Sequence, residues 1–70
     1  MPLVIAPIGQ DLRIIRISTN EKTKKHLESL GMIINSTIKI LSQSRGGVIC
    51  IVKGVRLALD NYIAVKIFVA

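Results

Sequence analysis

The residues whose side chains could do chemistry are few and lie far apart. The chain of 70 residues has one histidine, His26, and one cysteine, Cys50. A metal site needs three or four ligands that converge, but Cys50 is expected inside the fold on a strand remote from His26. Glu28 is two residues from His26 and therefore on another side of the expected helix. The sequence predicts no tight metal site, and we interpret His26 as an exposed helix histidine.

The carboxylates are equally dispersed. General acid–base catalysis needs titratable groups that meet, and no spacing suggests a serine, histidine and acid triple. The Arg-Gly-Gly segment at 45–47 lacks the lysine and the spacing of a phosphate-binding loop. The sequence therefore predicts that the protein is not an enzyme. The four acidic residues are Asp11, Glu21, Glu28 and Asp60.

Composition narrows the class of protein. Ten Lys and Arg against four Asp and Glu give a net charge of +6, and half of the residues are apolar. Ile, Val and Leu make up 26 residues, 13 of them Ile, and β-branched side chains favour strands. This composition excludes a disordered tail and a large enzyme with a deep cleft. A basic balance admits nucleic acid, an anionic membrane surface or an acidic protein face as partners.

The single cysteine also bears on the compartment. Cys50 cannot form an internal disulfide, whereas small secreted domains usually rely on several. The N-terminal ten residues lack the positively charged region of a signal peptide, and their apolar stretch is too short for its hydrophobic region. No stretch approaches the roughly 18 apolar residues that a bilayer crossing needs. We expect a cytoplasmic protein without membrane insertion.

One segment, 20–30, predicts a helix. Asn20 or Thr19 is suited to cap its N-terminus by accepting a backbone N–H. Gly31 follows directly and suits the left-handed residue after a helix. The apolar stripe through Leu27 is narrow, so the helix must be held by packing.

The rest of the chain consists of short apolar runs separated by turn signals. Imperfect alternation in the first run predicts either a bulge or two half-covered faces. Closing such strands on themselves hides sheet edges, so we expect one domain over 1–70. Its fold class is mainly β, a small SH3-like barrel of about five strands with one short helix. The expected strands are 12–18, 36–42, 48–53, 55–60 and 62–70.

The strand over 48–53 is apolar on both faces. Val48, Cys50 and Val52 share one parity and would fill the barrel, so Cys50 is interpreted as a core residue. Ile49 and Ile51 share the other parity and would face outward. Two apolar faces on one strand indicate that something covers the outer one.

The order of these segments resembles the FeoA family, small SH3-like barrel proteins of bacterial ferrous iron uptake. The matching positions are Gly9 in "PIGQ", the Leu-Gly-Met at 30–32 that ends the helix, and "GVRLAL" at 54–59. Asn35 stands where the family often has glycine, and asparagine tolerates positive φ. The resemblance implies a cytoplasmic accessory protein that binds or regulates FeoB, the membrane GTPase transporter.

The resemblance and the apolar strand together indicate an adaptor that binds a protein. Cations near a helix N-terminus oppose the helix dipole, so the lysines at the start of the helix are candidates for contact with an acidic partner. The competing interpretation is an ordinary solvated face for these lysines and an ordinary surface arginine at position 56. The candidate partner-binding residues are Ile49, Ile51, Lys22, Lys24, Lys25 and Arg56.

Three alternatives stay open. Small basic barrels also bind nucleic acid, and Tyr62 and Phe68, on one expected strand and of one parity, could stack on bases or simply fill the barrel. The outward isoleucines could instead pair two copies into a homo-oligomer. No cofactor is firmly predicted, and weak binding of ferrous ion or another transition metal is an alternative to none.

Overall fold

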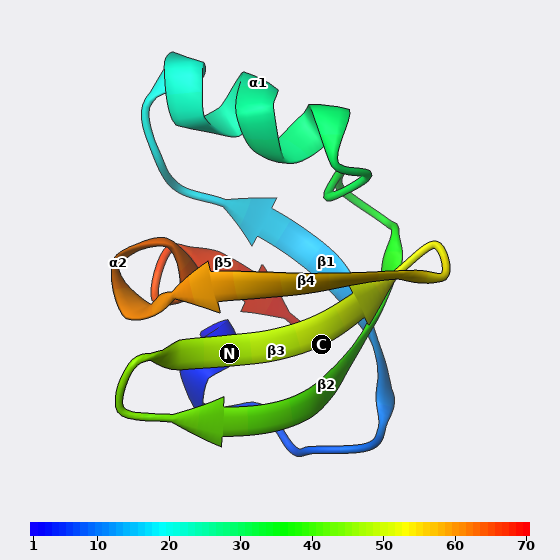
Figure 1. The fold of residues 1–70 in the computed structure, drawn as a ribbon. Coiled ribbons are helices and arrows are strands. Elements are labelled where there is room, and N and C mark those ends of the chain that lie inside the picture. Colours follow the sequence, from blue (N-terminus) through cyan, green and yellow to red (C-terminus); the bar gives the residue numbers. More distant parts are fainter.

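A computed structural model describes residues 1–70. Five strands form one antiparallel sheet in the order β4-β3-β2-β1-β5, with one nine-residue helix and two short helical turns (Figure 1). The predicted class, mainly β with five strands and one short helix, is confirmed. The elements in chain order are η1 Leu3–Ile5, β1 Asp11–Ile17, α1 Glu21–Ser29, β2 Thr37–Ser44, β3 Gly47–Val52, β4 Val55–Asp60, α2 Asn61–Ala64 and β5 Ile67–Val69.

The predicted bulge lies in β1. Register with β5 shifts between Ile14 and Arg16, so Ile14 and Ile17 are both buried while Ile15 between them is exposed. A bulge increases local twist and bends the strand. The first half of β1 pairs with β2 and the second half with β5, and this bend wraps the sheet around the core.

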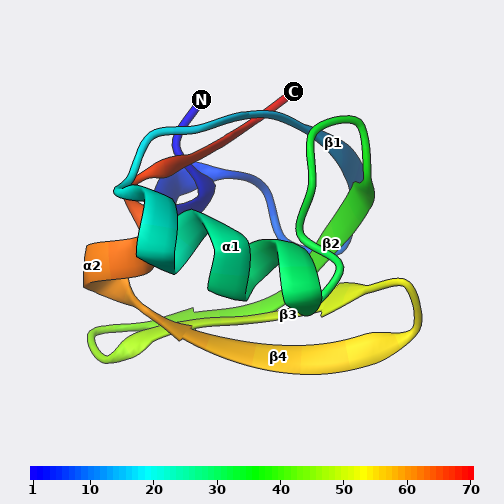
Figure 2. The same ribbon diagram turned by 90° about the horizontal axis from the view of Figure 1, so that it is seen from above.

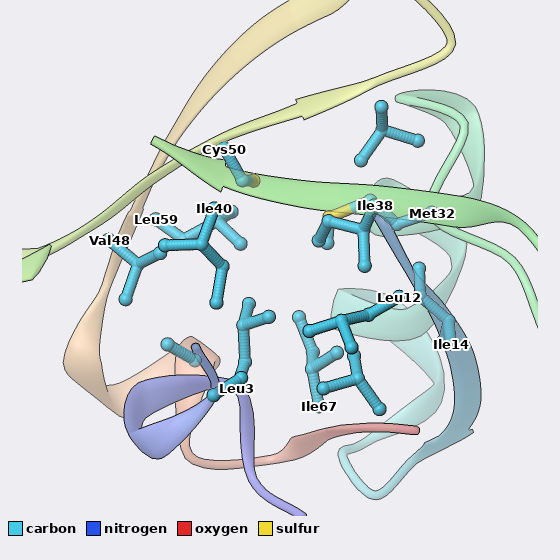
Figure 3. Close-up of a cluster of buried hydrophobic side chains, with 14 of the residues drawn as sticks. Leu3, Leu12, Ile14, Met32, Ile38, Ile40, Val48, Cys50, Leu59 and Ile67 are labelled. Carbon is cyan, nitrogen blue, oxygen red and sulfur yellow. The ribbon is translucent and has the colours of Figure 1, made fainter. Parts of the chain in front are cut away.

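The core is a single cluster of 16 buried residues, all apolar, to which every strand contributes (Figure 3). Helix α1 joins it through Leu27, which is 1% exposed. The Asn20 side chain accepts the backbone N–H of Thr23 at 2.8 Å, so Asn20 is the cap. Gly31 follows the helix at φ +96°, as predicted for the residue that stops it.

The predicted final strand over 62–70 is wrong in its first half. The Asp60 side chain accepts the backbone N–H of Ile63 at 2.9 Å, which caps the one-turn helix α2. Val65 lies just after this turn and is exposed, and β5 has only three residues. The β-branched residues of this segment favour a strand, but the Asp60 side chain binds a nearby backbone N–H and so favours a helical turn instead.

The N-terminal segment covers one edge of the sheet, which the sequence did not predict. The Met1 ammonium donates to the Val69 carbonyl, and the Val69 N–H donates to the Met1 carbonyl, both at 2.8 Å. Pro2 forms a bridge to Phe68. At the other end of the order, β4 is paired only to β3. Neither helix has the length and continuous apolar sequence that a membrane crossing needs.

Candidate docking surface

Strand β3 presents its side chains as its alternation predicted. Val48, Cys50 and Val52 are buried, whereas Ile49 is 38% exposed and Ile51 is half-buried. Successive residues of a strand point to opposite faces, so the two isoleucines lie on the side of the sheet away from the core. Their predicted outward direction is confirmed.

The strands on either side decide what surrounds these isoleucines. Opposite Ile51 lie Lys39 from β2 and Arg56 from β4. Directly opposed side chains are about 5 Å apart at Cβ, so Ile51 lies between two cations with aliphatic stems. Smaller residues flank Ile49. We call this set the outer face: Lys39, Ser42, Ile49, Ile51, Arg56 and Ala58.

Both cations of the outer face are available to a partner. Lys39 Nζ lies 3.7 Å from the Asp11 carboxylate, but both side chains are well exposed, and such surface pairs contribute little. Arg56 has no ion-pair partner within the chain. A row of cation, isoleucine and cation is suited to an acidic surface with an apolar centre. The sequence analysis did not include Lys39 among the candidate residues. Alternation along 36–42 showed which face Lys39 occupies, but it could not show that Lys39 lies opposite Ile51.

The lysines of α1 do not join the outer face. Figure 2 shows α1 on the inner side of the β2-β3-β4 sheet, where Leu27 anchors it to the core. Lys22, Lys24 and Lys25 therefore belong to a separate basic surface, and the predicted candidate set divides into two. Ile49, Ile51 and Arg56 stay together.

The predicted pair of stacking rings is not formed. Tyr62 lies in α2 and is 84% exposed, whereas Phe68 lies in β5 and is half-buried. The Arg16 guanidinium lies 5.5 Å from the centre of the Phe68 ring and covers one face of it. The two rings are on different elements because α2 interrupts the expected strand, so they make no common platform for bases.

No cluster of three or more histidine, cysteine or acidic side chains is present in the chain. Cys50 is fully buried and has no disulfide partner. Its sulfur lies among aliphatic side chains of the core (Figure 3). Burial raises the pKa of the Cys50 thiol from 9.0 to about 11, because desolvation disfavours the thiolate. The thiol is therefore protonated at neutral pH and shielded from solvent.

This burial predicts a loss of stability in alkali. The unfolded thiol ionises near pH 9 and the folded one only near pH 11, so its contribution is complete below pH 9 and falls as pH rises between these values. At pH 10.5 the loss relative to pH 8 is about 2 kcal/mol. Urea unfolding of wild type and Cys50→Ala at both pH values measures it. Equal pH dependence in the two proteins would contradict the assignment.

Known proteins resemble this chain over its full length. Residues 1–70 match the FeoA domain family. The chain belongs to the FeoA family. A protein of Methanocaldococcus jannaschii described as "Putative Fe(2+) transport protein A" is 31% identical over 68 residues, which cover 97% of this chain and 83% of that protein. The FeoA chain described here is thus a ferrous iron transport accessory protein and not an enzyme.

Solved structures share its fold. A crystal structure of an iron uptake regulatory protein, FeoA, superposes with a TM-score of 0.89 at 27% identity, covering 99% of this chain and 93% of the other. The solution structure of iron(II) transport protein A from Clostridium thermocellum also gives a TM-score of 0.89, at 21% identity over 99% of this chain and 44% of that one. The SH3-like FeoA fold expected from the sequence is confirmed.

Proposed function

We propose that this FeoA protein works in the cytoplasm and docks through its outer face on the cytoplasmic part of a FeoB-type GTPase transporter. Membership of the FeoA family supports the ferrous iron pathway. The observation that carries the docking surface is the row in which Ile51 lies between Lys39 and Arg56. An accessory protein without catalytic groups acts by binding, and this row offers both apolar contact and charge.

The two parts of the row have different physical roles. Fully burying an isoleucine side chain contributes about 1.5–3 kcal/mol before association costs, and Ile49 and Ile51 retain part of their surface for that burial. The flanking cations, Lys39 and Arg56, orient an acidic partner and raise the association rate. The apolar centre therefore sets how long the complex lasts, and the charges set how it forms.

Substituting Ile51 tests the proposal. Ile51→Glu removes the apolar centre of the row and places a carboxylate between Lys39 and Arg56, where it offsets the positive charge that would face an acidic partner. We expect affinity for the transporter's soluble GTP-binding domain to fall at least tenfold, since roughly 1.4 kcal/mol gives that factor. Calorimetric titration of that domain with wild type and variant measures the change.

The matched control is Ile8→Glu, which makes the same substitution at an isoleucine that is 55% exposed and lies in the turn before β1. It changes charge equally but leaves the outer face intact, so wild-type affinity is expected. If Ile8→Glu and Ile51→Glu bind alike, the outer face is not the docking surface. Circular dichroism of each variant checks that the sheet is retained.

A further inference from the structure

The outer edge of β4 is long, regular and unpaired. Its ladder with β3 continues through consecutive pairs from Gly47↔Asp60 to Val52↔Val55 without a bulge. β4 stands at the end of the strand order and pairs only with β3, and Figure 2 shows α1 set back from it. The edge of β5, by contrast, is covered by Met1 and Pro2. Strand edges of this kind are templates for pairing with another chain, and proteins usually protect them with bulges, prolines or short length.

Hairpin geometry shows which backbone groups point outward from this edge. Lys53 and Gly54 form a two-residue turn with φ of +52° and +78°, the pattern of a type I′ hairpin. In such a hairpin the residues that flank the turn exchange hydrogen bonds, and every second pair along an antiparallel ladder does the same. Val55, Leu57 and Leu59 therefore bond to β3. The N–H groups that point away from β3 are those of Arg56, Ala58 and Asp60.

The charges on these outward residues complement one another when the strand meets its own copy. In an antiparallel pair centred on Ala58, Arg56 of each copy lies opposite Asp60 of the other. One two-fold contact thus makes two unlike-charge pairs, and the small exposed Ala58 lies at the axis. If the pair were centred on Arg56 instead, the Arg56 side chains of the two copies would lie directly opposite each other, and this pairing of like charges is unfavourable. The Asp60 oxygen that does not accept from Ile63 is free for this contact.

We propose that two copies of this protein pair along β4, antiparallel and centred on Ala58. The pairing joins the β2-β3-β4 strands of both copies into one continuous sheet. Its backbone bonds link Ala58 to Ala58, and Arg56 carbonyls to Asp60 N–H groups. The Asp60 carbonyl takes no part, because the carbonyl of a helix cap already accepts the first helical bond. The outer faces of the two copies then lie on the same side of the joined sheet.

Cysteine cross-linking tests both the contact and its register. In a hydrogen-bonded antiparallel pair the Cα atoms are about 5.5 Å apart, within the range of a disulfide. Ala58→Cys is therefore expected to oxidise rapidly to a covalent dimer. Arg56→Cys lies four residues, or about 13 Å, from its own copy in this register and is expected to stay reduced. Equal cross-linking of the two variants, or none in Ala58→Cys, would overturn the proposal.

Sedimentation equilibrium provides a test without cross-links. The wild-type mass is expected to rise from 7.7 kDa towards twice that value with concentration. Ala58→Pro removes an N–H that β3 does not use, and proline is tolerated on that side of an edge strand, so this variant is expected to fold as a monomer. Arg56→Glu is expected to weaken association at least tenfold, whereas Lys66→Glu, an equal charge change at an exposed lysine, leaves it unchanged.

Amide hydrogen exchange locates the contact independently of these variants. The Ala58 and Asp60 amides are expected to gain protection as wild-type concentration rises, and the Asp60 amide is expected to exchange freely in Ala58→Pro. A wild type that stays monomeric at millimolar concentration with these two amides unprotected overturns the pairing. So does protection that appears only when the transporter's domain is added, which would assign the edge to another protein. The cross-linking, sedimentation and concentration-dependent exchange experiments use this protein alone, so their outcomes do not depend on the proposed function.

Discussion

Gly47→Ala is expected to remove most of the stability of the protein. A Cβ atom at this position would lie 2.1 Å from the Leu59 carbonyl oxygen, and the backbone has φ of +152°. That oxygen belongs to the β3–β4 ladder, where Val48 and Leu59 are paired, so it cannot move without breaking the hairpin. Overpacking costs about 1–3 kcal/mol and backbone strain a similar amount. A domain of this size has roughly 4–10 kcal/mol in total.

The adjacent glycine is a matched control. A Cβ atom at Gly46 would meet only the Ser44 Oγ at 3.9 Å, an ordinary contact. Gly46→Ala is therefore expected to change the free energy of unfolding by less than about 1 kcal/mol. Urea unfolding of both variants measures the difference. Similar destabilisation by the two substitutions would show that the close approach at Gly47 is not what limits this hairpin.

Leu27→Ala is expected to cost about 2–5 kcal/mol. Leu27 is the only buried side chain of α1, and a nine-residue helix with one apolar anchor is unstable by itself. Removing the anchor leaves a cavity and frees the helix from the core. We therefore expect lower global stability together with a larger rise in amide exchange over Glu21–Ser29 than over β3.

The neighbouring His26 provides the comparison for this substitution. His26→Ala changes an exposed side chain of the same helix, and such surface substitutions stay within about 0.5 kcal/mol. Urea unfolding and amide exchange of both variants measure the contrast. A cost for Leu27→Ala no larger than that for His26→Ala would mean that α1 does not depend on this contact.

Several local features were predictable because the chemistry that produces them is local. Asn20 caps α1 through a side chain three residues from the amide that it binds, and Gly31 ends the helix because it tolerates positive φ. Asn35 adopts φ of +75°, as expected of an asparagine in place of glycine. The alternation in β3 likewise indicated which residues fill the core, since its period is a property of any strand.

The structure of the segment after Asp60 was mispredicted because two local preferences compete there. The segment after Asp60 has strand-like composition, but the carboxylate captures the Ile63 N–H and starts α2. Tyr62 and Phe68 were placed on one strand for this reason, and the stacking prediction failed with it. Composition favours a strand only on average, whereas one well-placed capping bond settles the local conformation.

The sequence by itself determined the family, the helix and its caps, the buried face of β3, and the outward direction of Ile49, Ile51 and Arg56. Tertiary structure alone decided that Lys39 joins them and that the lysines of α1 do not. Which residues lie opposite one another depends on the register between strands, and here that register is set by the Lys53–Gly54 turn and by bulges in β1 and β2. A period-two pattern assigns a side chain to a face, but it carries no information about its neighbours across the sheet.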